Sequence, residues 1–228
     1  IVLGGSLQAT NAGLPAATPV ISVTSGHDIV LNTVDLTAVT SGGVKLTAAN
    51  SVNLNNVDVC CSPISGVDNI TAVGNIDITA TAGSIARATN DGRNLTGANI
   101  TLTAGGSMGS LFGAVNATAG DVVMTVTGSG TTLDMSGTGV TALNNVTLTA
   151  PGAVATSGVT ATNGNVLITS TGANVGVGVL SSGANVTVNA LNGISASTTT
   201  AGTASNGVIA FASTGAVGDI VLTGSLQA

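Results

Sequence analysis

The sequence predicts an all-β fold in which short parallel strands stack as a β-solenoid. Two observations lead to this prediction: a composition that suits strands and turns, and a strand motif that recurs about every 20–24 residues. Val, Thr and Ile favour strands, whereas Gly, Asn and Asp favour turns, and the 228 residues are dominated by Gly, Ala, Thr, Val, Asn and Ser. Glu, one of the best surface helix formers, is absent, and all nine acidic residues are Asp.

The recurring motif begins with Gly or Asn, continues with Asn or Asp, and then runs apolar–x–apolar–Thr–small, with some positions varied between instances. From Ile76 onward, the first apolar positions are separated by 24, 22, 24, 20 and 20 residues, and Val208 adds a step of 22. A period of this length, with turn residues between the strands, is typical of solenoids. The instances are Gly26–Leu31, Gly43–Ala48, Gly74–Ala80, Asn99–Ala104, Gly120–Thr125, Asn145–Ala150, Gly164–Thr169, Asn185–Ala190 and Gly218–Thr223.

Within each motif, apolar and polar residues alternate with the period of two expected for a strand. Ile100 and Leu102 are expected to fill the interior of the coil, whereas Thr101 and Thr103 should face water. Further runs of the same kind should form the other faces of each coil, as in Ser51–Val59 and Gly113–Thr118.

The two ends of the chain carry nearly the same sequence. IVLGGSLQA at 1–9 and IVLTGSLQA at 220–228 agree at eight of nine positions, at an offset of 219 residues. We therefore predict that residues 1–228 form a single β-solenoid segment, about one 219-residue tandem super-repeat of roughly ten coils with about 50 Å of axial rise. The predicted repeat-junction residues are Ile1, Val2, Leu3, Ser6, Leu7, Gln8, Ile220, Val221, Leu222, Ser225, Leu226 and Gln227.

Repeats of the type Gly-Asn-Val-x-Leu-Thr-Ala resemble those of filamentous haemagglutinin-type exoproteins and related giant bacterial adhesins. This resemblance concerns the scaffold and covers most of the chain. It implies a right-handed parallel β-helix, a location outside the cell or on its surface, and secretion through an outer-membrane pore. It transfers no catalytic residues. The near-identical 219-residue period departs from the approximate coil repeats that are usual in such rods.

Two irregular segments are predicted to form loops. The step from Val44 to Ile76 is 32 residues, so an insertion is expected there, with Cys60–Pro63 in a protruding loop near 59–66. The second segment is Thr10–Pro19, which contains two prolines. The adjacent cysteines could form a strained vicinal disulfide, cross-link neighbouring rods, or remain two thiols, one buried and one exposed. The candidate disulfide or cross-link residues are Cys60 and Cys61.

Composition argues against several functions. The formal net charge is −6, and the only basic residues, Lys45, Arg87 and Arg93, cannot make a phosphate-binding stripe, so no nucleic-acid partner is expected. A metal site is not expected because His27 is the only histidine. The absence of Trp and Tyr argues against a sugar-cleaving site, and no catalytic residue, cofactor or small-molecule substrate is predicted. Turn capping is the role expected for the acidic residues that precede strand motifs, namely Asp28, Asp121 and Asp219.

The leading functional hypothesis is therefore structural: a segment of an extracellular filament, sheath or adhesin stalk whose partner is a further copy of itself, end to end and with lateral rod packing. The alternative is an adhesin module that binds a ligand through the loops near 10–19 and 59–66. A polysaccharide-processing enzyme would need two carboxylates in one groove. Ice binding would need outward Thr pairs in every coil, and Lys45, Asp77, Val123, Leu167 and Asn189 interrupt them. The Asn-x-Thr triplets are potential glycan acceptors. The strand motif itself contains Asn-Val-Thr, so the motif explains these triplets better than glycan attachment does.

Overall fold

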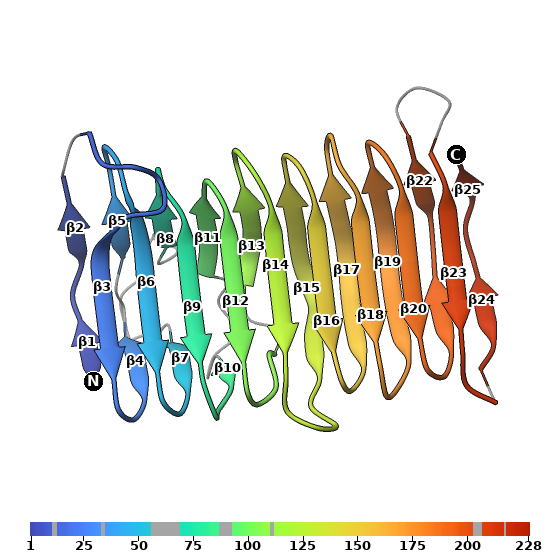
Figure 1. Ribbon diagram of the computed structural model, residues 1–228, viewed down its shortest axis with the longest axis horizontal. Helices are drawn as coiled ribbons and strands as arrows, with labels where there is room; N and C mark the ends of the chain where they lie inside the picture. The colour runs from blue at the N-terminus through green and yellow to red at the C-terminus, as the bar shows by residue number, and fades with distance from the viewer. Residues whose placement is uncertain are drawn as a thin grey trace, which may run out of the picture.

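The computed structural model describes residues 1–10, 13–32, 35–55, 69–86, 93–109, 112–202, 207–216 and 218–228. All regular structure in these ranges is β-strand, and every strand pairing is parallel. The predicted all-β parallel β-solenoid is therefore confirmed. Figure 1 shows one rod with its two ends at opposite extremes, and its coils follow one another along the long axis.

One broad sheet, the front sheet, covers one side of the rod. Its strands run downward in Figure 1 while the strands behind run upward, and the chain advances from left to right, so the coil is right-handed. The sheet has nine strands, all fully within the described residues. They are β3 (Pro19–Ser25), β6 (Gly43–Ala48), β9 (Ile76–Ala80), β12 (Ile100–Ala104), β14 (Val122–Val126), β16 (Val146–Ala150), β18 (Val166–Ser170), β20 (Val186–Ala190) and β23 (Ile209–Ser213).

The opposite side consists of two rows of strands. The lower back row contains β1 (Val2–Gly4), β4 (Ile29–Asn32), β7 (Val52–Asn55), β10 (Ile85–Ala86), β21 (Ile194–Ala196) and β24 (Ile220–Leu222). The upper back row contains β2 (Leu7–Ala9), β5 (Leu36–Ala38), β8 (Asn69–Ala72), β11 (Arg93–Gly97), β13 (Phe112–Ala117), β22 (Thr199–Ala201) and β25 (Leu226–Gln227). Three long strands span both rows: β15 (Leu133–Ala142), β17 (Val154–Ala161) and β19 (Val175–Ser182).

The interior is filled by the inward residues of each strand. Ile100 and Leu102 are fully buried, whereas Thr101 is exposed and Thr103 half-buried, as the alternation predicted. Because equivalent strands are in register, each inward side chain stacks on its counterparts in the neighbouring coils. Leu102, for example, is paired with Ile78 on one side and Met124 on the other. This stacking removes apolar surface from water that a single coil could not bury alone.

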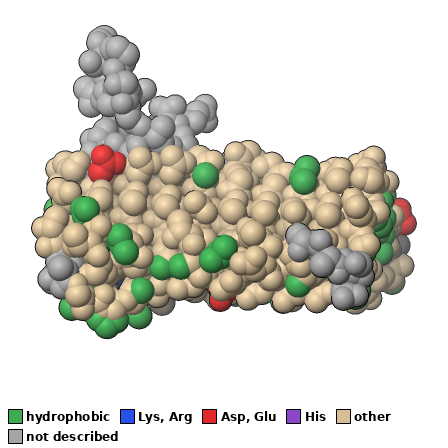
Figure 2. All heavy atoms as spheres, turned by 90° about the horizontal axis from the view of Figure 1, so that it is seen from above, with side chains coloured by type: hydrophobic (Ala, Val, Ile, Leu, Met, Phe, Trp, Pro, Cys, Tyr) green, Lys and Arg blue, Asp and Glu red, His purple; other side chains and the backbone are tan. Residues whose placement is uncertain are grey.

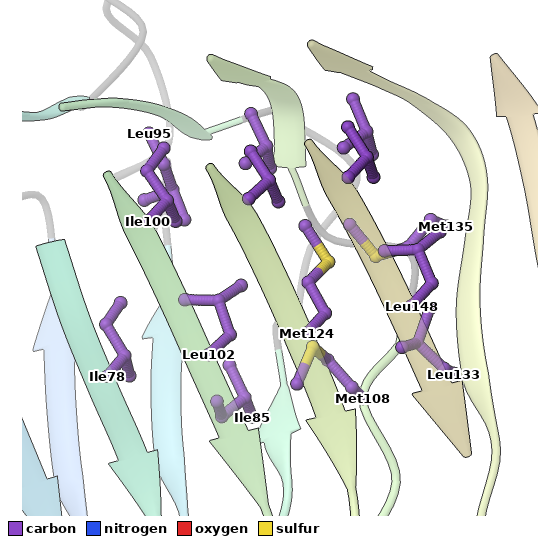
Figure 3. Close-up of a cluster of buried hydrophobic side chains, with 14 of the residues drawn as sticks. Ile78, Ile85, Leu95, Ile100, Leu102, Met108, Met124, Leu133, Met135 and Leu148 are labelled. Carbon is purple, nitrogen blue, oxygen red and sulfur yellow. The ribbon is translucent and has the colours of Figure 1, made fainter. Parts of the chain in front are cut away.

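All three methionines of the chain meet in the middle of the rod. Met108, Met124 and Met135 are fully buried, and Figure 3 shows their side chains gathered beside Ile85, Leu133 and Leu148, between the front and back layers. At this point the lower back row is reduced to single bridges, Ile85 to Met108 and Met108 to Leu133. The flexible thioether side chain can fill the irregular space left by such a reduced strand.

The strand registers correct three predictions. The last front strand pairs Val186 with Ile209, so the final step is 23 residues and Val208 lies outside the strand. The motifs Gly26–Leu31 and Gly218–Thr223 form β4 and β24 in the lower back row, and so do not belong to the front sheet. Nine lateral steps, not ten, lead from β1 to β24 along that row. Nine steps at strand spacing give about 43 Å.

Candidate functional site

The repeated end segments occupy equivalent places in the coil. The first copy forms β1 and β2, and the second forms β24 and β25, in the same two back rows. β1 pairs with β4 on its inner side, and β24 pairs with β21 on its inner side. The first copy therefore contacts the coil that follows the repeated strand pair, and the second copy contacts the coil that precedes it.

Matching residues of the two copies also face the same way. Val2 is in register with the half-buried Val30, and Val221 with the exposed Ser195, so both point outward. Leu3 and Leu222 point inward, since their register partners Leu31 and Ala196 are buried. Leu7 and Leu226 likewise pair with the buried residues Leu36 and Thr199.

Backbone hydrogen bonds of the two copies are complementary. In the first copy, the Ile1 amino group donates to the Asp28 carbonyl at 2.8 Å, and the Val30 N–H donates to the Ile1 carbonyl at 2.8 Å. In the second copy, the Thr223 N–H donates to the Ala196 carbonyl and the Thr199 N–H donates to the Ser225 carbonyl, both at 2.9 Å. The first set joins the segment to the following coil and the second set joins it to the preceding coil. A single copy placed between both neighbours could form the two sets together.

Apolar side chains are open at both ends of the rod. Ile220, Leu222 and Leu226 are 43%, 39% and 45% exposed although they point inward, because no coil covers them. At the other end Ile1 is 50% and Leu7 39% exposed. Uncovered inward residues and unpaired strand edges are the features expected where a further coil can stack.

A ladder of side-chain amides follows the upper front corner of the rod. Each member lies just before a front strand, and each asparagine after the first donates from Nδ2 to the member in the preceding coil. Examples are Asn145 Nδ2 to Asp121 Oδ1 at 3.0 Å and Asn185 Nδ2 to Asn165 Oδ1 at 3.0 Å. The oxygen also accepts the backbone N–H of the next coil, as Asn99 Oδ1 does from Asp121 at 2.9 Å. The members are Asn75, Asn99, Asp121, Asn145, Asn165 and Asn185, and the last accepts the N–H of Val208.

The outer surface of the front sheet carries two columns of outward side chains. Column 1 consists of Ser22, Lys45, Asp77, Thr101, Val123, Thr147, Leu167, Thr187 and Ala210. Column 2 consists of Thr24, Thr47, Thr79, Thr103, Thr125, Thr149, Thr169, Asn189 and Ala212. Column 2 is thus threonine in seven consecutive coils, whereas column 1 is mixed, as the interrupted pairs in the sequence indicated.

Charged groups are sparse over the described part of the rod. Figure 2 shows one face on which acidic side chains are widely separated and most of the surface is neither charged nor hydrophobic. No group of three or more His, Cys, Asp or Glu side chains that could hold a metal occurs in the described ranges. The shallow groove lined by Gly176, Ser195 and Val221 contains one carboxylate, that of Asp219.

The predicted capping positions of the acidic residues differ from one another. Asp121 belongs to the amide ladder, whereas Asp28 precedes the lower back strand β4 and accepts the Ser51 N–H at 2.9 Å. Asp219 precedes β24 in the same back row. All three residues directly precede a strand, as the motif predicted, but they lie at two different corners of the coil. Asp28 and Asp121 each accept an N–H from the coil that follows them.

The predicted loops are only partly described. Cys60 and Cys61, and the whole of 59–66, lie outside the described residues. In the other segment, 13–19 is described, and it packs across a corner of the rod: the Leu14 N–H donates to Ser41 Oγ at 3.1 Å, and the Ala16 carbonyl accepts the Asn75 N–H at 2.9 Å. This part of the segment therefore lies beside Asn75, at the N-terminal end of the amide ladder.

Most of the Asn-x-Thr asparagines are engaged in bonds between coils. Asn99, Asn145 and Asn185 belong to the amide ladder, and Asn94 Nδ2 donates to Asn69 Oδ1 at 3.0 Å in a shorter ladder beside the upper back row. Asn116 instead lies outward on β13. The amide nitrogens of these ladder members already serve the stacking of coils.

Comparison with known proteins gives no relative: no protein-family profile, curated protein or solved structure matches the chain. The described residues contain no helix long and apolar enough to cross a membrane. The geometry of the rod and of its repeated ends is therefore what bears on function.

Proposed function

We propose that this chain is one period of a structural extracellular filament, sheath or adhesin stalk built from tandem β-solenoid repeats. One observation carries the proposal: the segments 1–9 and 220–228 have nearly the same sequence, the same two strands and the same inward and outward faces. In the array, one such segment replaces both copies, and it bonds to β21 on one side and to β4 of the next period on the other.

The front sheet supports the same continuation. When the two segments are merged, β23 of one period becomes the neighbour of β3 of the next, and each row then contributes nine positions per period, one of which is the Met108 bridge in the lower back row. Stacking two separate chains end on would instead retain both copies and leave one strand missing between β23 and β3. Covalent continuity at a period of 219 residues therefore fits the three rows better than stacking of separate chains.

A two-period chain, with the full 1–228 placed before residues 10–228, tests this proposal. At the junction Ile220, Leu222 and Leu226 become covered, and covering two-fifths of three large apolar side chains should add about 3 kcal/mol to the stability of the end coils. We expect a higher urea midpoint than for one period and a rod longer by about 43 Å in small-angle scattering. Two units that unfold at the midpoint of the single period, joined flexibly, would refute end-to-end stacking.

Two neighbouring residues provide a matched control. At the junction of the two-period chain, Leu222→Asp should remove the gain because the charge would be buried, whereas Val221→Asp should change stability by less than about 0.5 kcal/mol because it points outward. In the single period both side chains are partly exposed, at 39% and 49%. A difference between the two substitutions that appears only in the longer chain is thus specific to the junction.

Location and export follow from the haemagglutinin resemblance alone. We propose a cell-surface position and passage through an outer-membrane pore, and an antibody against the rod should label intact cells that make it. The alternative adhesin function gains no support from the described part of 10–19, which packs on the rod. A further copy of the same chain remains the partner that the geometry favours.

A further inference from the structure

The front sheet presents a nearly neutral surface over the whole rod. Only Lys45 and Asp77 are charged among the eighteen residues of its two columns. These two are register partners on adjacent strands, and no ion pair joins either of them to another described residue within hydrogen-bonding range. The remaining positions are mostly threonine, whose branched side chain loses little freedom when it is covered.

We propose that this surface is a lateral interface with a second copy of the chain, packed face to face with the rod axes antiparallel. The order of residues along column 1 identifies the arrangement. A two-fold axis that lies along the strand direction keeps each column opposite itself and reverses the order of the coils. One such axis falls between β6 and β9 and another falls on β18.

The first axis brings the two charges into reciprocal contact. Lys45 faces Asp77 of the second copy, and Asp77 faces its Lys45, so two ion pairs form around the axis. On either side, Ser22 faces Thr101 and Thr101 faces Ser22. Each charged group thus meets its opposite, and each hydroxyl meets a hydroxyl.

The second axis brings apolar residues together. Leu167, 37% exposed in the single rod, faces the same residue of the second copy. One coil away Thr147 faces Thr187, and two coils away Val123 faces Ala210. Every residue of column 1 is therefore matched in chemical type by one of the two axes.

The parallel arrangement lacks this complementarity. An axis along the rod places column 1 opposite column 2 at the same coil. Lys45 would then face Thr47, Asp77 would face Thr79, and Leu167 would face Thr169, so that each charge and the largest apolar residue would lie against a threonine. The column pattern consequently favours the antiparallel pair.

The area available depends on how many coils overlap at each axis. Each coil presents a strand of five residues at about 3.3 Å, and neighbouring coils are about 4.8 Å apart, so nine coils carry roughly 700 Å². Within one period the first axis overlaps four coils and the second overlaps five, which gives roughly 300 and 400 Å² per partner, against about 800 Å² in a standard specific interface. A single period should therefore associate weakly, whereas a tandem array brings both axes into one interface.

The two axes are four and a half coil steps apart, which is half of the nine-step period. They repeat at equal intervals along an array, so one rod can meet the same neighbour at both axes only if the period repeats. To that extent the inference rests on the proposed tandem filament. A single period can still use each axis separately, with two different neighbours.

Charge exchange tests the interface on the full 228-residue chain. We expect the unmodified chain at high concentration to associate beyond pairs in analytical ultracentrifugation, because each of its two axes takes a different neighbour. Lys45→Asp or Asp77→Lys, each alone, should limit association to the pairs formed at β18, because like charges meet at the first axis. Mixing the two variants should restore association beyond pairs, because an all-acidic pair then faces an all-basic pair. The mixture changes nothing within either rod, so restoration reports contact between rods. Absence of association in the unmodified chain, or no restoration on mixing, would overturn the proposal.

Cross-linking tests the antiparallel direction, in a background with Cys60 and Cys61 replaced by serine. A short thiol cross-linker should join Leu167→Cys chains to each other. It should not join Val123→Cys chains, whose new thiols would lie four coils, or about 19 Å, apart along the axis. Val123→Cys mixed with Ala210→Cys should cross-link. Equal cross-linking of the two single variants would overturn the antiparallel arrangement.

These tests are independent of the test of tandem stacking. A two-period chain that gains stability but stays unpaired would refute only the lateral interface. Single-period rods that pair as described, in a chain whose two periods unfold independently, would refute only the tandem filament.

Discussion

The amide ladder makes a sharp prediction at the one position where it contains a carboxylate. Asn145 Nδ2 donates to Asp121 Oδ1 at 3.0 Å. In the variant Asn145→Asp this hydrogen bond is lost, which costs about 1 kcal/mol, and two carboxylates face each other instead. Two such charges about 4 Å apart repel by about 1 kcal/mol in water and about 4 kcal/mol near a protein surface. For a half-buried pair we take about 2 kcal/mol, so the total loss is about 3 kcal/mol.

The same substitution one coil further is the control. Asn165 donates to the neutral Asn145 Oδ1 at 3.3 Å, so Asn165→Asp loses a bond without repulsion and should cost about 1 kcal/mol. Adding Asp121→Asn to Asn145→Asp should remove the repulsion and leave about the same 1 kcal/mol. The assay is urea unfolding followed by circular dichroism at pH 7. Equal losses for Asn145→Asp and Asn165→Asp at pH 7 would refute the ladder contact.

Three further predictions concern packing, and all can be read from the urea midpoint. Gly74→Ala should destabilise by more than about 2 kcal/mol because its Cβ would collide with backbone atoms of the neighbouring coil. Gly176→Ala, whose Cβ would have no atom within 4 Å, should be nearly neutral. Similar losses for the two variants would contradict the corner packing. Leu102→Ala should cost about 2–5 kcal/mol, against less than about 0.5 kcal/mol for the 53%-exposed Val179→Ala. Thr199→Val should stabilise by about 1 kcal/mol because the buried hydroxyl has no partner in the described residues, and a loss would show that it has one.

The strands of the front sheet could be predicted from the sequence because the residue before each strand marks which apolar residue comes first. Where Asn or Asp precedes the first apolar residue, as at Ile76 and Ile100, the predicted register agrees with the structure. It fails by one residue at Val208, where the place of the amide is itself taken by an apolar residue. Three apolar residues in a run of four then allow either register, and only the bond from the Val208 N–H to Asn185 Oδ1 shows which residue begins the strand.

The division into rows could not be read from the same motif. An Asn or Asp before an apolar residue marks any corner of the coil, because in each row its side chain can accept the N–H of the next coil. Asp28 and Asp121 both do so, from different corners. The number of coils was overestimated because the insertion between Val44 and Ile76 lengthens one coil without adding another.

The repeated ends were recognisable from sequence identity, but their roles were not. That Ile1 and Ile220 are equivalent follows from the sequence match alone, in which eight of nine positions agree. Which neighbour each copy contacts depends on backbone pairings with β4 and β21, more than twenty residues away in the chain. The complementarity of column 1 is likewise hidden, since its members are scattered through the whole sequence and align only once the registers are known.

The amide ladder runs from Asn75 to Asn185, so the proposed array alternates between coils that contain the ladder and coils that lack it. Along the front corner, the three coils of β23, β3 and β6 carry no ladder amide, and the pairing of β3 with β6 also shifts register near Pro19. A filament pulled along its axis would therefore yield first in these three coils, while the stretch from β9 to β20 held. Each period would act as a stiff bar with a compliant joint, so that a long filament could absorb a sudden load without tearing its ordered core.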